Sequence, residues 1–109
     1  MTKQAKIEVP EAPAHLSERS KELWLKIVPK RALSPGRLAL LQTALESLDR
    51  AEQARLEVDR VGLTTTTKTT GAVHVHPLVK VERENRQLFA RLWGELGLVW
   101  DHELDGRRW

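Results

Sequence analysis

The feature that most constrains the fold is an uninterrupted helical pattern that runs from Ser34 to Val61. Ser34 followed by Pro35 is typical of a helix start, because serine caps free N–H groups and proline fits the first helical position. Gly62 suits the position directly after the helix. One helix of this length spans roughly 40 Å, at about 1.5 Å per residue. That exceeds what a chain of 109 residues needs for its own core, so we predict that the helix projects or contacts another subunit.

The apolar residues of this helix predict where copies of the chain meet. They repeat with steps of three, four and three residues, which gives a seam as narrow as that of a coiled coil. The seam consists of Leu38, Leu41, Leu45 and Leu48, and Leu56 is the main apolar residue of the charged segment that follows. A chain this short buries only about 60–70% of its unfolded surface, so a single copy has a thin core. We therefore predict an oligomer-forming chain whose interface contains Leu41, Leu45, Leu48 and Leu56.

Two shorter helices are predicted on either side of the long one. The first begins at Ser17, a good N-cap, and ends at Pro29, because proline cannot donate to the helical hydrogen-bond ladder. The third begins at His76-Pro77 and stops at Gly97. Both carry one-sided apolar stripes with the helical period, which places the tryptophans in the core. The stripes are Leu16, Ser20, Leu23, Trp24, Ile27 and Val28 in the first helix and Leu78, Val81, Asn85, Leu88, Phe89, Leu92, Trp93 and Leu96 in the third.

Residues 63–75 differ from the helical segments, because six of them are threonine, a β-branched residue and a poor helix former. Gly71 allows the chain to reverse between two short extended arms. Both a small β-hairpin and a mobile loop are compatible with this pattern. A lone two-stranded hairpin is marginal in water, so it needs packing or partner strands to be ordered.

The predicted fold is mainly α, a helix–turn–long helix hairpin followed by the threonine-rich insert and a third helix. Residues 16–98 form the helical domain. Residues 1–15 are polar, contain two prolines and show no period, which predicts a disordered arm. Residues 99–109 form a tail in which Trp100 and Trp109 are candidate anchors on this or another subunit.

The residue types argue against an enzyme. Cysteine is absent, no serine has the glycine-flanked turn of a hydrolase nucleophile, and no glycine-rich phosphate loop precedes a lysine. His74 and His76 are spaced to share one face of a strand, but no third ligand lies near them in sequence. We therefore assign His76 to a helix cap or loop and expect no catalytic residue, no metal and no cofactor.

The sequence also lacks the apolar run of about 18–20 residues that a membrane helix needs, and its start lacks the apolar region of a signal peptide. We therefore expect a soluble, intracellular protein. Its net charge of +3 is uneven. Residues 1–37 carry eight basic and four acidic residues, whereas the remainder carries ten and eleven. The positive charge is thus concentrated in the N-terminal third.

The basic residues around the first helix and the following turn are candidates for nucleic-acid binding. Phosphate contacts need lysine or arginine, and a helix start adds backbone N–H donors. The candidates are Lys21, Lys26, Lys30, Arg31 and Arg37. The alternative is that these residues are solubilising charges beside Glu18 and Glu22.

Several segments with a distinctive order and spacing cover residues 13–98. They are Pro13-Ala14-His15-Leu16-Ser17 leading into a helix with Trp24, Leu33-Ser34-Pro35-Gly36, the threonine-rich insert, HPLVKVERENRQLFARLWGELGL from His76-Pro77 onward, and the closing Leu96-Gly97-Leu98. In this order they resemble the small subunits of phage terminases, and the last two are the most specific part. Such proteins often continue into a tail rich in proline and arginine, from which the tail VWDHELDGRRW departs.

The resemblance implies a non-catalytic DNA-packaging protein of the host cytoplasm during phage assembly. Small subunits of terminases bind the packaging-initiation region of double-stranded viral DNA and form homo-oligomeric rings. They regulate the terminase large subunit, which carries the ATPase and the nuclease. Two alternatives remain open, a virion structural or head–tail adaptor protein and a small helical DNA-binding regulator. A large ring disfavours the regulator, which is expected to be a two-fold dimer.

Overall fold

Three helices make up most of the structure, which is a computed structural model that describes residues 9–31 and 34–100. The helices are α1 (Glu18–Arg31), α2 (Pro35–Val61) and α3 (Pro77–Glu95), and a short 3-10 helix, η1 (Leu98–Trp100), follows. Between α2 and α3, strands β1 (Thr64–Thr66) and β2 (Val73–Val75) form an antiparallel hairpin. The prediction of a mainly helical fold is therefore confirmed. Of the two alternatives for residues 63–75, the structure has the hairpin.

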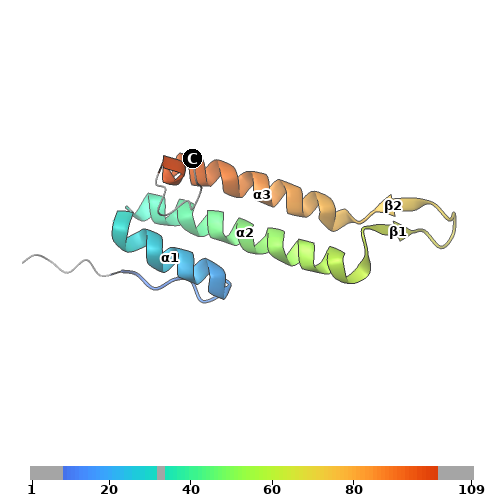
Figure 1. Ribbon diagram of the computed structural model, residues 1–109, viewed down its shortest axis with the longest axis horizontal. Helices are drawn as coiled ribbons and strands as arrows, with labels where there is room; N and C mark the ends of the chain where they lie inside the picture. Colours follow the sequence, from blue (N-terminus) through green and yellow to red (C-terminus); the bar gives the residue numbers. More distant parts are fainter. Residues whose placement is uncertain (1–8, 32–33, 101–109) are drawn as a thin grey trace, which may run out of the picture.

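The molecule is long and thin, with extents of 77 × 33 × 21 Å. Figure 1 shows α2 and α3 running antiparallel along most of their length, while α1 lies against only the N-terminal half of α2. The hairpin continues beyond the far ends of α2 and α3. The molecule thus has a three-helix end, a two-helix middle and a two-stranded tip.

The sequence signals at the helix starts have the geometry expected of them. Ser34 is extended, and its side chain accepts a hydrogen bond from the backbone N–H of Arg37 at 3.4 Å. His76 caps α3, because its ring Nδ1 accepts from the N–H of Leu78 at 3.1 Å. Gly97, which follows α3, has a positive φ of 76°, a conformation that glycine adopts without strain. Local residue chemistry therefore sets these helix ends.

The helix boundary predicted at Pro29 is wrong, because α1 continues through Pro29 to Arg31. Proline removes the hydrogen bond that its own N–H would give to the carbonyl four residues earlier, at Leu25. Leu25 is exposed, so water can satisfy that carbonyl. Proline in the last turn of a helix therefore costs little here.

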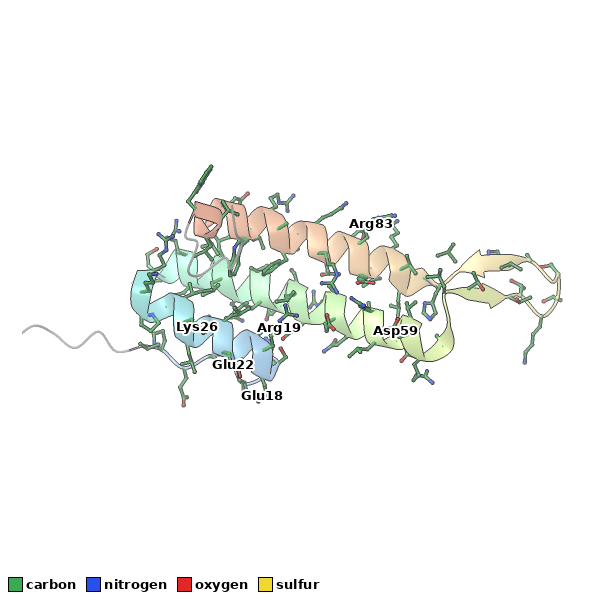
Figure 2. The ribbon with its side chains drawn as sticks, in the orientation of Figure 1. Glu18, Arg19, Glu22, Lys26, Asp59 and Arg83 are labelled. Carbon is green, nitrogen blue, oxygen red and sulfur yellow. The ribbon has the colours of Figure 1, made fainter. Side chains whose placement is uncertain are left out.

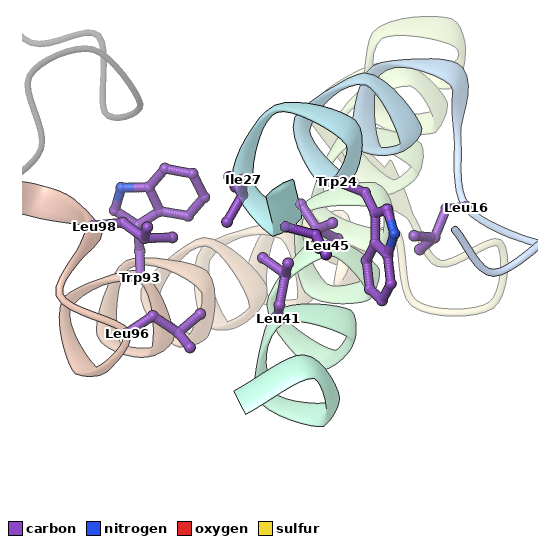
Figure 3. Packing of buried hydrophobic residues seen from close by; sticks show 9 residues of the cluster. Leu16, Trp24, Ile27, Leu41, Leu45, Trp93, Leu96 and Leu98 are labelled. Atoms are coloured by element: carbon purple, nitrogen blue, oxygen red, sulfur yellow. The ribbon is translucent and has the colours of Figure 1, made fainter. Parts of the chain in front are cut away.

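The main hydrophobic core lies at the three-helix end. Figure 3 shows Leu41 and Leu45 of α2 between the side chains of α1 and those of the α3–η1 end. Leu41, Leu45 and Ile27 are completely buried. The core cluster is Leu16, Trp24, Ile27, Val28, Leu41, Leu45, Trp93, Leu96 and Leu98. Farther along α2, the buried side chains are small, at Ala51, Ala54 and Val58, and small residues allow helices to approach closely.

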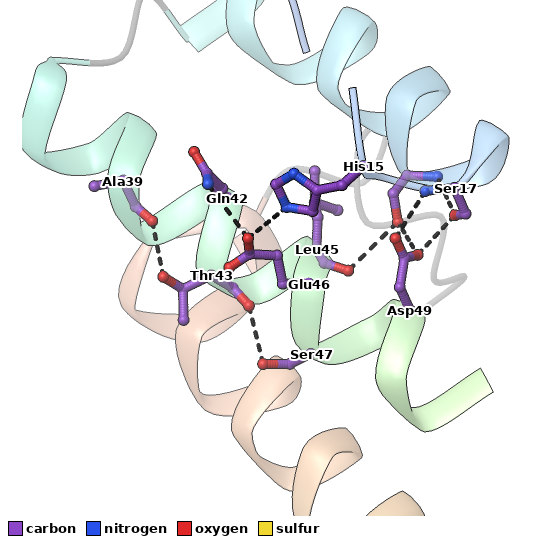
Figure 4. Close-up of polar contacts among 10 residues, drawn as sticks. His15, Ser17, Ala39, Gln42, Thr43, Leu45, Glu46, Ser47 and Asp49 are labelled. Atoms are coloured by element: carbon purple, nitrogen blue, oxygen red, sulfur yellow. Dashed lines mark hydrogen bonds and ion pairs between the residues drawn. The ribbon is translucent and has the colours of Figure 1, made fainter. Parts of the chain in front are cut away.

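The first turn of α1 is held by a carboxylate from α2. Asp49 accepts hydrogen bonds from the backbone N–H of Ser17 at 2.8 Å and from its hydroxyl at 2.6 Å (Figure 4). The hydroxyl of the fully buried Ser20 donates to the same carboxylate at 2.5 Å. The oxygen of Ser17 in turn accepts from the N–H of Ser20 at 3.1 Å. The predicted N-cap at Ser17 is therefore present, and Asp49 ties it to α2.

The predicted disordered arm, residues 1–15, is only partly within the described residues, since 1–8 lie outside them. For residues 9–15 the prediction is wrong. The indole N–H of Trp24 donates to the carbonyl of Pro10 at 2.8 Å, and Val9 packs against the core cluster. A polar composition does not reveal such contacts, because they depend on the surface that α1 and α2 offer together.

The arm also supplies a pH-dependent contact. Nε2 of His15 lies 2.6 Å from Oε2 of Glu46 on α2, and this hydrogen bond lowers the pKa of Glu46 from its ordinary value of 4.5. A carboxyl group with a lowered pKa stabilises the folded state above its unfolded pKa, and that contribution disappears as the pH falls through the folded pKa.

We therefore expect Glu46→Gln, which cannot ionise, to lose stability less steeply than the wild type does as the pH falls below 4.5. Urea unfolding at a series of pH values measures this. Glu22→Gln removes the same charge from an exposed position of α1 and should retain the wild-type steepness. An unchanged acid dependence in Glu46→Gln would contradict a role for the contact with His15.

Candidate nucleic-acid interface

Three basic side chains share one side of α1. Lys26 and Lys30 lie seven and eleven residues after Arg19, and residues with these spacings lie on one side of a helix of about 3.6 residues per turn. All three are exposed, and Figure 2 shows Arg19 and Lys26 along the same helix. Arg19 was not among the predicted site residues, although its helical spacing from Lys26 and Lys30 could have revealed it. We call Arg19, Lys26 and Lys30 the α1 basic face.

Lys21 is not part of this face. It lies two residues after Arg19, on nearly the opposite side of the helix. Its ammonium group lies 3.7 Å from a carboxylate oxygen of Glu18, and its side chain is only one-third exposed. The structure therefore separates Lys21 from Lys26 and Lys30.

Arg31 and Arg37 make contacts that hold the fold together. The guanidinium of Arg31 donates to the carbonyl of Gly97 at 3.4 Å, and that of Arg37 donates to the carbonyl of Leu96. These carbonyls lie at the C-terminal end of α3, where the helix dipole favours positive charge. Both arginines are half-buried. Arg31 and Arg37 therefore serve to hold the end of α3 in place. A sequence pattern alone cannot distinguish arginines with this role from arginines that bind phosphate.

Acidic residues moderate the α1 basic face. Glu22 is exposed on α1 and lies four residues before Lys26 and three after Arg19 (Figure 2). Side chains at these spacings are neighbours on a helix surface. One copy of the chain therefore presents a weak positive patch, and tight binding of a polyanion would need several copies.

The predicted oligomer interface needs correction. Leu41 and Leu45 are fully buried and Leu48 is 5% exposed, all within a single chain. Only Leu56, at 59% exposure, remains on the surface. The α2 seam faces α1 and α3 because these helices return to cover it, which the sequence of α2 alone does not specify. Among the described residues, the large apolar side chains that stay exposed are Leu25, Leu40, Leu56, Val61, Leu63, Val73, Val75 and Trp100.

The side chains of His74 and His76 have different surroundings. His74 is exposed on β2, and Nδ1 of His76 is used in capping α3. Within residues 9–31 and 34–100, no three histidine, aspartate or glutamate side chains are grouped so that they could hold a metal ion. No helix in this part of the chain is long and apolar enough to span a membrane. The candidate tail residue Trp109 lies outside the described residues, whereas Trp100 is 79% exposed.

Comparison of the chain with protein-family models, with curated proteins and with solved structures finds no match.

Proposed function

We propose that this protein is a non-catalytic DNA-packaging protein of the terminase small-subunit type. In this role it forms a homo-oligomeric ring, binds double-stranded viral DNA and regulates a separate large subunit that carries the ATPase and the nuclease. The proposal is supported by the order of the motifs over residues 13–98 and by the exposed cations of the α1 basic face. The α1 basic face is the observation that carries the DNA-binding part of it.

The chemistry of the α1 basic face suits phosphate binding without base recognition. Lysine and arginine contacts to phosphates release counterions, which drives binding and makes it depend on salt. Three cations moderated by Glu22 bind weakly in one copy. In a ring, the second and later contacts occur at high effective concentration, so many weak patches together bind tightly.

The proposed ring is supported by apolar surface that one copy leaves exposed. Leu25, Leu56 and Trp100 are each more than half exposed and lie on different elements. Contacts between different patches of neighbouring copies repeat by rotation, and they close a ring when the rotation divides a full turn. We accordingly propose that the α2–α3 helix pair is the subunit scaffold of such a ring.

The test is a charge reversal confined to the α1 basic face. We expect Lys26→Glu combined with Lys30→Glu to weaken binding of a DNA duplex at least about tenfold and to reduce the slope of log affinity against log salt by roughly 2 per copy engaged. Fluorescence anisotropy with a labelled duplex at several salt concentrations measures both. Arg31 and Arg37 are left unchanged, because their substitution would disturb the docking of α3.

A single charge reversal away from this face, Lys80→Glu, is the control; it reverses an exposed lysine of α3 that lies 3.7 Å from Glu84. It should leave affinity and salt slope close to those of the wild type. Thermal unfolding of all variants verifies that the fold is retained. Equal DNA binding by the double variant and the wild type would remove the α1 basic face from the proposal. Native mass spectrometry that finds a two-fold dimer instead of a ring would favour a DNA-binding regulator.

A further inference from the structure

Among residues 9–31 and 34–100, no further strand pairs with the hairpin at the tip of the molecule. Its sheet contains only β1 and β2, and Figure 1 shows it extending past the ends of α2 and α3. Val73 is 67% exposed and Val75 is 62% exposed. Two strands without packing are marginally stable in water. The described part of the chain therefore gives this element no third strand, which is a contact that ordinarily helps to keep a hairpin ordered.

The register shows which backbone groups point away from the hairpin. The N–H of Thr67 donates to Ala72, and that of His76 donates to Leu63, each at 2.8 Å. Hydrogen-bonded and non-bonded pairs alternate along antiparallel strands. The non-bonded pairs between these two positions are therefore Thr64 with Val75 and Thr66 with Val73.

It follows that both edges of the hairpin are open. The N–H and C=O groups of Thr64 and Thr66 point outward along β1, and those of Val73 and Val75 point outward along β2. None of these residues is proline, so each has a donor and an acceptor. Each edge thus offers the N–H and C=O groups of two residues that lie two positions apart. Another β-strand can form hydrogen bonds with groups in this arrangement.

The strands are short, at three residues each, but their edges carry no other feature that usually prevents pairing between molecules. Natural proteins protect exposed edges with charged residues, prolines or bulges. The strands here read TTT and VHV, and the nearest charged residue, Lys68, lies in the turn. Side chains of a strand point alternately to its two faces. The side chains on one face of the hairpin are therefore Thr64, Thr66, Val73 and Val75, and these β-branched residues are favourable in a sheet.

We propose that the hairpins of neighbouring copies pair edge to edge, with β1 of one copy against β2 of the next. This inference rests on the proposed function, because it takes the assembly to be a closed ring. In copies related by rotation about one axis, all β1 strands run in the same direction along that axis, and all β2 strands run in the opposite direction. The contact between β2 and the next β1 is therefore antiparallel, and the tips form one continuous sheet.

A second copy fits this surface better than DNA does. An identical hairpin supplies the complementary edge, and with a single lysine in the turn the copies repel one another little. DNA would instead be bound through Lys68 and the threonine hydroxyls, which would leave Val73 and Val75 in contact with water or phosphate. The exposed valines therefore favour a protein partner, and DNA binding by the hairpin is an outcome that the test can detect.

The test compares two substitutions that add the same charge to the same hairpin. Thr66→Lys places a lysine on the β1 edge, whereas Thr69→Lys places it in the exposed turn. We expect Thr66→Lys to raise the concentration needed for assembly roughly fivefold or more, because like charges and lost packing oppose strand pairing. Thr69→Lys should assemble as the wild type does. Native mass spectrometry over a dilution series measures both, and equal assembly of the two variants would overturn the proposal.

Hydrogen exchange provides a second readout that does not depend on a substitution. In the dilute single chain, the amides of Thr64, Thr66, Val73 and Val75 should exchange quickly, because they point outward. In the assembled wild type they should exchange about tenfold more slowly or more, since each gains an acceptor. Assembly that leaves these four amides unprotected would overturn the proposal even if Thr66→Lys fails to fold.

DNA binding by the same proteins separates this inference from the proposed function. If the wild-type protein assembles with protected edge amides but binds no DNA, the proposed function is rejected and the hairpin contact still stands. If the wild-type protein binds DNA through the α1 basic face but assembles without protection of the edge amides, only the hairpin contact is rejected. If Lys68→Glu assembles normally but no longer binds DNA, and the edge amides exchange quickly in the assembly, then the hairpin binds DNA and not a second copy.

Discussion

Replacement of Leu45 by alanine should lower the free energy of unfolding by about 3 kcal/mol, which is typical of a buried leucine in a well-packed core. Leu45 is fully buried, and α1 and the α3–η1 end enclose it on two sides. The substitution removes the apolar contacts of the side chain and leaves a cavity between packed helices that cannot close completely. Urea unfolding of dilute protein, where association is minimal, measures the loss.

Leu56→Ala is the matched control, because it makes the same change on the same helix at a position that is 59% exposed. Its effect on the unfolding of the single chain should stay within about 0.5 kcal/mol, as for other surface positions. The opposite result is informative too. If Leu45→Ala prevented association but left the stability of the single chain unchanged, the α2 seam would be an interface between subunits after all.

Replacement of Asp49 by alanine should cost about 2–3 kcal/mol of stability. Its carboxylate accepts hydrogen bonds from the N–H and hydroxyl of Ser17 and from the hydroxyl of Ser20. Hydrogen bonds to charged groups contribute more than neutral ones, and a buried donor left without a partner carries a desolvation cost. Ser20 is fully buried, so its hydroxyl would keep only the carbonyl of Leu45, at 3.5 Å.

Asp59→Ala provides the comparison for Asp49→Ala. Asp59 lies on the same helix and its carboxylate is 3.8 Å from Arg55, with both side chains well exposed. Exposed ion pairs of this kind contribute less than about 1 kcal/mol, so this variant should unfold nearly as the wild type does. Equal stabilities of the two variants would show that Asp49 does not hold α1 on α2. Hydrogen exchange of the first turn of α1 should increase in Asp49→Ala alone.

The helix starts and ends were accessible from the sequence where a single local interaction decides them. Ser17, Ser34 and His76 each cap a helix through their own side chains, and Gly97 follows α3 with a backbone conformation suited to glycine. Pro29 shows the limit of such signals. Its effect depends on whether the carbonyl that it leaves unbonded can reach water, and that depends on which side of α1 is buried.

The sequence predicted the candidate site only in part, because side chains of the same kind contact different partners in the folded chain. Lys26, Lys30 and Arg37 look alike in the sequence, yet Arg37 donates to the end of α3, 59 residues away along the chain. The missed residue Arg19 joins Lys26 and Lys30 through helical spacing alone. Local periodicity could therefore have found one more member of the face, but nothing local could have removed Arg31 and Arg37.

By itself the sequence determined where the helices begin, their caps and the end of the helical pattern at the threonines, because these depend on side chains within a few residues of one another. The tertiary structure alone decided that Leu41, Leu45 and Leu48 face the chain's own helices and that residues 9–15 pack on α1 and α2. It also left the hairpin without a third strand from the described part of the chain. Burial is a property of what lies opposite a residue, and for these residues the opposite surface comes from distant parts of the chain.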